Sequence, residues 1–302
     1  MATFILILCL MLLGYTFRKT QLFPKQTSDV LNLFVIYISL PAIILLEVPK
    51  IEFSSDVMVP IIIPWITTFL GALTILFFSK IFQLDKNTTG ALLLVGILGN
   101  TSFLGIPVGS HYYGVQAIPY VMIYDQLGSF LLLSTYGAFV VAFYSDNSHI
   151  KVNASHIILK ILKFPPFIAL MAAFFLRGIE FNADLVNALN TLGNTLIPMA
   201  LISVGFSLQL KLSRDEIKPF LIGLGTKLII VPIYAFILVY FFGFEGLATD
   251  VSILESAMGP MITAGVVASM AGFAPKLTAA IVGYGILFSI VTTAIVVELI
   301  KI

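Results

Sequence analysis

The sequence predicts an all-α polytopic membrane protein with ten transmembrane helices, arranged as two inverted repeats of five helices. Of the 302 residues, 59% are hydrophobic and 10% are charged, and the mean hydropathy is +1.08. A soluble domain carries about 25% charged residues, so this composition excludes an ordinary soluble protein. Ten apolar runs approach or exceed the length of about 20 helical residues that a bilayer requires.

The predicted transmembrane segments are separated by short stretches rich in charged and turn-forming residues. The first five are expected at 2–17, 29–46, 57–79, 88–113 and 117–144, and the second five at 156–177, 183–209, 216–242, 248–273 and 277–300. The polar stretch 146–155 is expected to be a cytoplasmic loop between the repeats 1–145 and 156–302. Because its charges follow the apolar run, the first segment is interpreted as a retained span and not as a signal peptide.

The distribution of basic residues predicts the orientation. Of the sixteen Lys and Arg residues, twelve follow odd-numbered spans and three follow even-numbered spans, and Lys227 lies inside span eight. Cytoplasmic loops carry the excess of basic residues. We therefore expect a cytoplasmic (inner) membrane protein with both termini on the non-cytoplasmic side.

Spacing indicates the inverted repeat. Pro41 and Pro198 lie 157 residues apart in spans two and seven, and the interruptions at Asn100 and Gly259 lie 159 residues apart in spans four and nine. Each half holds an odd number of spans, so the halves have opposite topology. This plan is typical of secondary transporters.

Span four is interrupted by the sequence GNTSFLGIP at 99–107. Pro107 lacks a backbone N–H and disfavours helical geometry at the residue before it, while Gly105 permits a bend. In a bilayer, such a break is tolerated where it is buried in protein or lines a cavity. The polar groups at this break belong to Asn100, Thr101 and Ser102.

Span nine contains a second interruption at 255–265, with the sequence ESAMGPMITAG. Two interrupted spans in matching positions indicate the binding site of a secondary transporter. Half-helix N-termini attract anions, while unwound carbonyls and side-chain oxygens bind a cation or a substrate. The predicted substrate-binding residues are Asn100, Thr101, Ser102, Gly105, Pro107, Lys227, Gly259, Pro260 and Thr263.

Three ionisable residues lie inside apolar spans: Asp125, Lys227 and Glu255. Each costs about 2.5–3.5 kcal/mol at a helix centre, so each should face protein or water. Lys227 would attract a substrate carboxylate. Asp125 and Glu255 would bind a coupling proton or a sodium ion, with a sodium site near Glu255 and Asn100 left open. The structural alternatives are an ion pair of Lys227 with either carboxylate and an interhelical hydrogen bond from Asn100.

The motifs of several other function classes are missing from the sequence. A single cysteine, Cys9, excludes an internal disulfide and a Cys-rich metal site. Phosphate-binding loops, zinc-ligand spacings and nucleophile elbows do not occur in the sequence. The buried charges are too scattered for an enzyme that acts on lipids. We expect no catalytic residues, no certain metal site, no cofactor beyond a coupling ion and no nucleic-acid partner.

The run GNTSFLGIPV at 99–108 resembles the auxin efflux carrier family, as do Leu40-Pro41 in span two and Gly259-Pro260 in span nine. The resemblance implies that the broken spans four and nine cross each other. It also implies a scaffold of spans one, two, six and seven, against which spans three to five and eight to ten move as an elevator. A homodimer is implied as well.

The family's bacterial members carry small organic acids such as malate or malonate, and its plant members export the aromatic acid auxin. The resemblance places Asn100 and Pro107 at the first crossover and Gly259 and Pro260 at the second. Plant members have an asparagine at the second crossover, and this sequence has none there. This departure, together with Lys227 and Glu255, favours a smaller and more polar substrate or a cation-coupled mechanism.

These observations predict a secondary active transporter of a small organic anion that works by elevator-type alternating access. The anion, membrane lipid and a second copy of the chain are its expected partners. The alternative is a sodium/proton antiporter or a sodium-coupled symporter of bile-acid type.

Overall fold

The computed structural model describes residues 2–50, 55–145, 154–208 and 210–301. These residues form helices and connecting loops, and one isolated antiparallel β-bridge joins Gly99 to Pro260. Residues 146–153 of the predicted cytoplasmic loop lie outside the described residues. The prediction of an all-helical protein is therefore confirmed for the part of the chain that the structure describes.

Six helical segments in the described residues are long and apolar enough to cross a membrane. They are Thr27–Lys50, Asp56–Ile81, Val115–Tyr144, Ala183–Ser207, Arg214–Phe242 and Pro275–Ile300. These segments match the predicted spans two, three, five, seven, eight and ten, which supports a multi-pass membrane protein. Of the remaining predicted spans, span one is the continuous helix Ala2–Thr20, and spans four, six and nine are divided or interrupted. The count of ten and the inverted repeat stay predictions.

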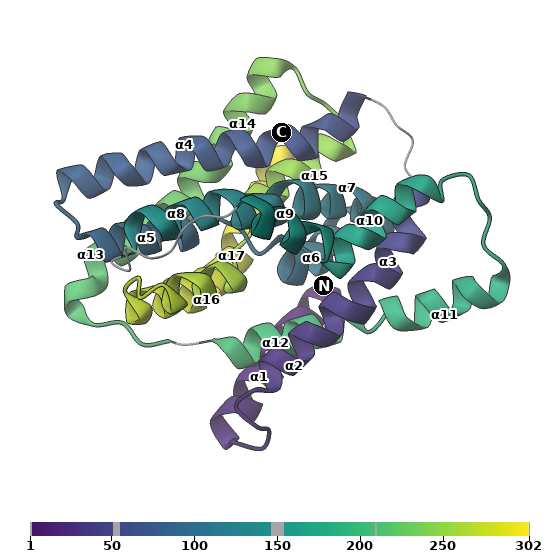
Figure 1. Ribbon diagram of the computed structural model, residues 1–302, viewed down its shortest axis with the longest axis horizontal. Helices are drawn as coiled ribbons and strands as arrows, with labels where there is room; N and C mark the ends of the chain where they lie inside the picture. The colour runs from purple at the N-terminus through teal and green to yellow at the C-terminus, as the bar shows by residue number, and fades with distance from the viewer. Residues whose placement is uncertain (1, 51–54, 146–153, 209, 302) are drawn as a thin grey trace.

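One group of helices packs around α12 and α3 and is called here the group around α12. Its members are α1 (Ala2–Thr20), α2 (Thr27–Phe34), α3 (Leu40–Glu47), α10 (Pro165–Phe175), α11 (Ala183–Gly193) and α12 (Leu196–Ser207). Both α1 and α2 contact α12, while α3 contacts α10 and α11. In Figure 1, α1, α2 and α12 lie together at the lower edge of the molecule, and α11 extends to the right.

The crossing of α1 and α12 depends on two glycines. A Cβ atom on Gly14 would overlap the carbonyl of Ile202, and a Cβ atom on Gly205 would overlap the carbonyl of Met11. Small residues let two membrane helices approach until their backbones touch. The two glycines therefore set the close packing of this pair.

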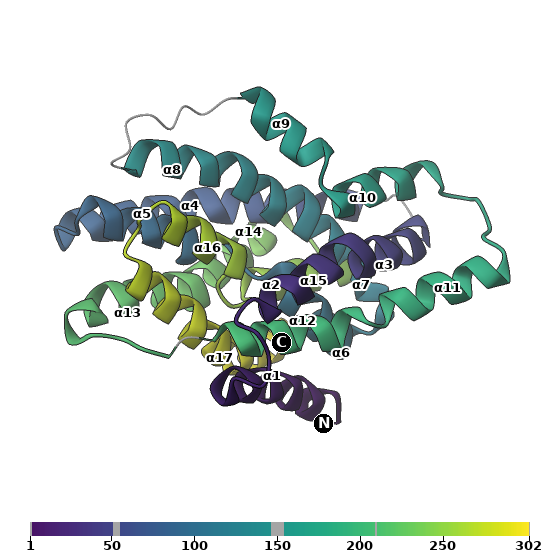
Figure 2. The same cartoon turned by 60° about the horizontal axis from the view of Figure 1, so that its bottom comes forward.

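A second group packs around α5 and α4 and is called here the group around α5. It comprises α4 (Val59–Ile81), α5 (Lys86–Val95), α8 (Ala138–Tyr144), α13 (Ile217–Gly225), α14 (Val231–Phe242), α15 (Leu247–Ser256), α16 (Ile262–Met270) and α17 (Pro275–Ile300). Helix α5 contacts α4, α8, α13, α16 and α17, and Figure 2 shows α4, α5, α8 and α16 on one side of the molecule. Residues Ala91–Val95 of α5 are all buried, as expected for an apolar helix enclosed by others.

Short elements connect the two groups. They are α6 (Ile106–Tyr113), α7 (Ile118–Ile123), α9 (Ala154–Leu162) and the 3₁₀ turns Val48–Lys50, Ser55–Met58, Val115–Ala117 and Arg214–Glu216. Helix α6 contacts α1 and α15, and α7 contacts α3, α4 and α15. Both helices thus touch members of each group.

Five π-helical segments widen the helices: η1 (Val35–Ser39), η4 (Thr101–Gly105), η6 (Tyr124–Phe130), η7 (Leu133–Gly137) and η9 (Thr226–Ile230). Three of them, η1, η4 and η9, end two residues before Pro41, Pro107 and Pro232. Proline removes one hydrogen bond and crowds the preceding turn, so a wide turn there relieves the clash. Single π turns inside helices are frequent at functional sites.

The interruption of span four lies earlier in the chain than its proline predicts. Helix α5 ends at Val95, the chain leaves helical geometry over 96–100, and η4 then runs directly into α6. Ile106 is helical, with φ −60° and ψ −53°, because the wide turn of η4 ahead of Pro107 relieves the clash that the proline would cause in a regular helix. The expected distortion at Ile106 is thus wrong, although the span is broken.

Candidate functional site

The two interruptions are joined to each other through their backbones. The Asn100 N–H donates to the Gly259 carbonyl at 2.8 Å, and the Met261 N–H donates to the Leu98 carbonyl at 2.9 Å. Backbone groups that leave a helix inside a bilayer need new partners. Each break supplies them for the other, so the ends of α5 and α15 and the starts of η4 and α16 meet at one place.

Asn100 caps the helix that starts at this junction. Its Oδ1 accepts from the Phe103 N–H at 3.3 Å, in the manner of an N-cap residue. The side chain is only 2% exposed, and its Nδ2 has no hydrogen-bond partner in the protein. A buried unpaired donor costs about 1–3 kcal/mol, so this amide group is available for a ligand acceptor.

Asp125 gathers the hydroxyl groups of the first break. Thr101 Oγ1 and Ser102 Oγ each donate to Asp125 Oδ1 at 2.5 Å, and Gln126 Nε2 donates to Oδ2 at 2.6 Å. Asp125 is 3% exposed and lies in η6. The structure thus brings together two residues predicted to bind substrate and one predicted to bind a coupling ion. These hydrogen bonds fix the start of η4 against η6.

Lys227 lies beside the junction from the other side. Its Nζ donates to the Ser256 carbonyl at 2.7 Å, and a Cβ atom on Gly99 would stand 3.3 Å from that Nζ. Lys227 is 1% exposed and belongs to η9. Lys227 forms no ion pair with Asp125 or Glu255, so the predicted structural ion pair is not found.

Glu255 is fully buried at the end of α15. Neither of its carboxylate oxygens has a hydrogen-bond partner in the protein. A small cavity of about 10 Å³ is lined by Gly99, Tyr124, Lys227 and Glu255, among others. This is about the space that one water molecule occupies. The charged cluster is therefore closed to larger ligands in this conformation.

The remaining predicted site residues have structural surroundings of different kinds. A Cβ atom on Gly259 would stand 2.8 Å from Ser289 Oγ, and Pro260 packs against Gly285, so both hold the second break against α17. Pro107 is buried in the first turn of α6. Thr263 is exposed on α16 and is not part of the cluster.

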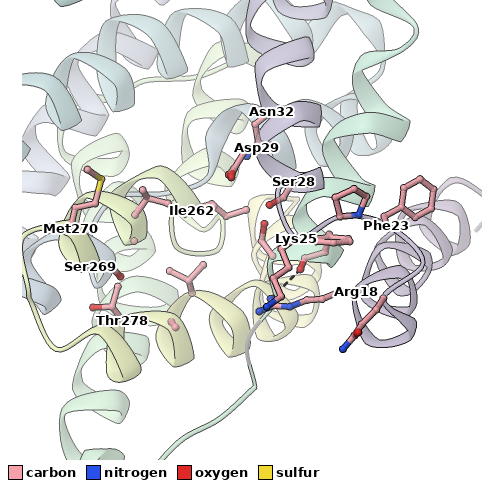
Figure 3. Close-up of a pocket in the computed structure, with 18 residues that line it drawn as sticks. Arg18, Phe23, Lys25, Ser28, Asp29, Asn32, Ile262, Ser269, Met270 and Thr278 are labelled. Atoms are coloured by element: carbon pink, nitrogen blue, oxygen red, sulfur yellow. Dashed lines mark hydrogen bonds between the residues drawn. The ribbon is translucent and has the colours of Figure 1, made fainter.

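A large pocket of about 850 Å³ lies between the two helix groups. Arg18, Lys25 and Asn32 line it from the α1–α2 side, and Ile262, Ser269 and Thr278 line it from α16 and α17 (Figure 3). Below we call this pocket the vestibule. Because Ile262 directly follows Met261 at the second break, the vestibule reaches the neighbourhood of the junction.

Polar contacts order the wall of the vestibule on the α1–α2 side. Arg18 donates to the carbonyls of Phe206 and Leu208 at 3.1 Å each, which ties the end of α1 to the end of α12. Ser203 Oγ donates to Asn32 Oδ1 at 2.6 Å. Arg18 was predicted only as one of the basic residues that set the orientation, and neither Asn32 nor Gln126 was predicted as a site residue. Gln126 could have been predicted from the sequence, because it is a polar residue inside an apolar span.

Among the described residues, no group of three or more His, Cys, Asp or Glu side chains could hold a metal ion. The sodium site near Glu255 and Asn100 stays a prediction.

Comparison with known proteins supports a transport function. Residues 1–297 match the family described as "Membrane transport protein". An uncharacterized transporter of Methanocaldococcus jannaschii is 30% identical over 267 residues, covering 84% of this chain and 83% of the relative. An uncharacterized transporter of Methanothermobacter thermautotrophicus is 28% identical over 276 residues, covering 88% and 87%. The chain therefore belongs to this membrane transport protein family, the auxin efflux carrier family that the motif at 99–108 resembles.

Proposed function

We propose that the protein is a secondary active transporter of a small organic anion in the cytoplasmic membrane. The observation that carries this proposal is the junction of two interrupted helices, joined by backbone hydrogen bonds beside the buried Lys227. Broken helices that meet near the centre of a membrane form the substrate sites of secondary transporters. The family membership supports transport, and the geometry supports an anion as its cargo.

Three features favour a carboxylate at this site. The helices that begin with η4 and α16 both start at the junction, so the positive ends of their dipoles meet there. Asn100 Nδ2 is a buried donor without a partner. Lys227 adds a positive charge that forms no ion pair. Together these groups supply the positive potential and the donor that an oxyanion requires.

The vestibule is the proposed route from the junction to the cytoplasm. Arg18 and Lys25 line it together with Asp29, which leaves a net positive charge at its mouth. Both basic residues belong to the loop that the distribution of Lys and Arg assigns to the cytoplasmic side. The vestibule thus corresponds to an inward-facing state.

The arrangement of helices supports an elevator mechanism. The group around α12 contains the helices of the expected scaffold spans one, two, six and seven. The group around α5 contains most of those of the expected moving spans three to five and eight to ten, while α6 and α7 of spans four and five lie between the two groups. In the proposed transport cycle, the second group carries the junction past the first, closes the vestibule and opens an equivalent space on the opposite side. The resemblance also supports a homodimer in the lipid bilayer, with the expected scaffold as the fixed part.

Proteoliposome uptake of radiolabelled malonate and malate tests the proposal. We expect Lys227→Met and Asn100→Ala to lower uptake by about 10- to 100-fold each, since each removes about 1.5–3 kcal/mol of charge-assisted or buried hydrogen bonding. Lys301→Met is the matched control, because Lys301 is exposed and contacts Glu298 at the end of α17. If both site variants take up substrate as fast as the wild-type protein, the substrate site is elsewhere.

The buried carboxylates support a second candidate, a sodium/proton antiporter or a sodium-coupled symporter of bile-acid type. Asp125 and Glu255 both lie within the cluster around the junction. Proton or sodium flux in proteoliposomes without any organic acid would favour the antiporter. Substrate uptake that requires sodium would favour the symporter.

A further inference from the structure

We propose that the transporter is a proton–anion symporter and that the Glu255 carboxyl carries the coupling proton. The inference rests on the proposed function, because it concerns the coupling of the same site. It specifies the ion, the residue that binds it and the reason that anion and proton move together.

Glu255 occupies a slot that two glycines make. A Cβ atom on Gly105 would overlap both carboxylate oxygens of Glu255, and a Cβ atom on Gly109 would stand 3.6 Å from Oε1. Residues four apart lie on one face of a helix, so η4 and α6 present a face without side chains to the Glu255 carboxyl group. The slot brings the carboxyl group against the helix that starts at the junction.

The slot offers no hydrogen bond to an ionised carboxylate. Both oxygens of Glu255 lack partners, and the residue is fully buried. An ionised group in such a place must be paired or hydrogen-bonded, or else take up a proton. The geometry in this conformation therefore suits the neutral acid.

Asp125 has the opposite surroundings. Three side-chain donors, from Thr101, Ser102 and Gln126, surround its two oxygens, and this arrangement stabilises the ionised form. Two carboxyl groups in such different surroundings take different roles. Asp125 acts as a fixed anion that holds η4 in place, and Glu255 is the group that exchanges a proton.

The charged groups that act on Glu255 come from two elements. Lys227 lies on η9 and Asp125 on η6, which also places Tyr124 nearby. The facing part of α4 contributes the uncharged Pro64, Thr67 and Thr68 to the same cavity. Lys227 is thus the one nearby cation among the groups that the structure describes around Glu255.

This arrangement couples the proton to the anion through charge balance. Lys227 and the fixed anion Asp125 balance each other, so the cluster carries one net negative charge when Glu255 is ionised and none when Glu255 is protonated. A substrate anion that binds beside an ionised Glu255 adds a second net negative charge buried in the membrane, which is costly. A proton on Glu255 cancels the charge that the anion adds, so loading both leaves the charge of the cluster unchanged. The two cargoes therefore move together.

The same geometry disfavours sodium as the coupling ion. A hard cation needs several oxygen ligands, whereas Glu255 faces two glycines and the Lys227 ammonium shares its cavity. The oxygens of Asp125 already accept hydrogen bonds from three donors.

The test compares exchange with accumulation in proteoliposomes that contain radiolabelled malonate or malate. Counterflow needs only substrate binding and the conformational cycle, whereas accumulation needs the coupling ion. In the wild-type protein, a pH gradient of one unit should raise the accumulation ratio by up to about tenfold, and a sodium gradient should not. Glu255→Gln should keep counterflow and lose the response to the pH gradient. Glu298→Gln is the matched control, because it makes the same substitution at an exposed position on α17. This variant should keep both counterflow and the response to the pH gradient.

Two results would overturn the inference. One is a Glu255→Gln protein that still accumulates substrate in response to a pH gradient. The other is a wild-type protein that is active in counterflow but admits no protons with the substrate, as followed by a pH-sensitive dye inside the liposomes. The dye measurement needs no variant, so it holds even if Glu255→Gln does not fold. Wild-type protein without counterflow of any organic acid would instead contradict the proposed function itself.

Discussion

At the scale of single residues, the site depends on where a side chain is missing as much as on where one is present. Gly105 matters because the Glu255 carboxyl group occupies the space of its absent side chain. Gly259 matters because Ser289 and Ile286 of α17 leave no room for a Cβ atom at the second break. These glycines let a carboxyl group and a neighbouring helix approach the backbone closely.

Gly105→Ala tests this interpretation. The added methyl group collides with both Glu255 oxygens, so we expect a loss of about 1–3 kcal/mol in stability and at least a tenfold loss of substrate uptake. The measurements are thermal unfolding in detergent and proteoliposome uptake. Gly225→Ala is the matched control, because a Cβ atom there meets nothing within 4 Å and should be neutral or slightly stabilising. Equal stability and equal uptake in the two variants would contradict the interpretation that the Glu255 carboxyl group fills the space beside Gly105.

The sequence predicted part of the site at this scale. It identified Asp125, Lys227 and Glu255, since a charge inside an apolar run is visible without a structure. It did not separate the roles of the two carboxylates, because the three donors around Asp125 and the bare glycine face at Glu255 come from other segments. Thr263 was included for its position near the second break. However, Ile262, Val266 and Ser269 face the vestibule, and Thr263 lies on another side of α16.

At the scale of elements, the interrupted spans show how local signals combine. The sequence GNTSFLGIP indicated a broken helix, but Pro107 alone did not locate the break. Proline is accommodated in the first turn of α6, and the π-helical turn η4 precedes it. The unwound residues 96–100 instead lie where their backbone groups meet those of the second break. That pairing is a tertiary interaction, which local sequence does not encode.

The start of α5 offers a test at this scale, outside the predicted spans. Asp85 accepts from the Thr88 N–H at 2.9 Å as the N-cap of α5. Burial alone would raise the pKa of Asp85, but the hydrogen bonds from Thr88 and its neighbours outweigh it and lower that pKa below its ordinary value of 3.8. Because the pKa is lower in the folded state, the cap contributes stability above the unfolded-state pKa, and this contribution is lost as the pH falls through the folded-state pKa.

Asp85→Ala should therefore lower stability by about 0.5–2 kcal/mol at neutral pH. At neutral pH, the stability of Asp85→Asn should stay within a few tenths of a kcal/mol of the wild-type stability, because Asn also caps helices. The difference between wild type and Asp85→Asn should disappear or reverse as the pH falls through the folded-state pKa, which lies below 3.8, as measured by thermal unfolding over a pH series. A difference that does not change with pH would show that the carboxylate charge plays no part.

At the scale of the whole molecule, the vestibule separates two groups of helices that the sequence could not place relative to each other. Its walls come from residues near 18–32, 206–207 and 262–282, so no local pattern could indicate it. The family resemblance implied a division into a scaffold and moving spans, and that division stays a prediction.

Chemical labelling tests on which side the vestibule opens. In a Cys9→Ser background, Ser269→Cys should react with a membrane-impermeant thiol reagent from the cytoplasmic side, and malonate should slow the reaction. Gln116→Cys is the matched control on the opposite side, since Gln116 is exposed in the turn between α6 and α7. Reaction of Ser269→Cys from the non-cytoplasmic side alone would reverse the proposed orientation.

The hydrogen bonds between the two breaks also have a consequence for the order of events during synthesis. Leu98 and Asn100 find their backbone partners at Met261 and Gly259, about 160 residues later in the chain. At about 5–20 residues per second, a ribosome needs roughly 10–30 s to make that stretch. During this interval the first break has no native partner inside the membrane. The backbone groups of Leu98 and Asn100 therefore stay without their native partners until the second break has been made.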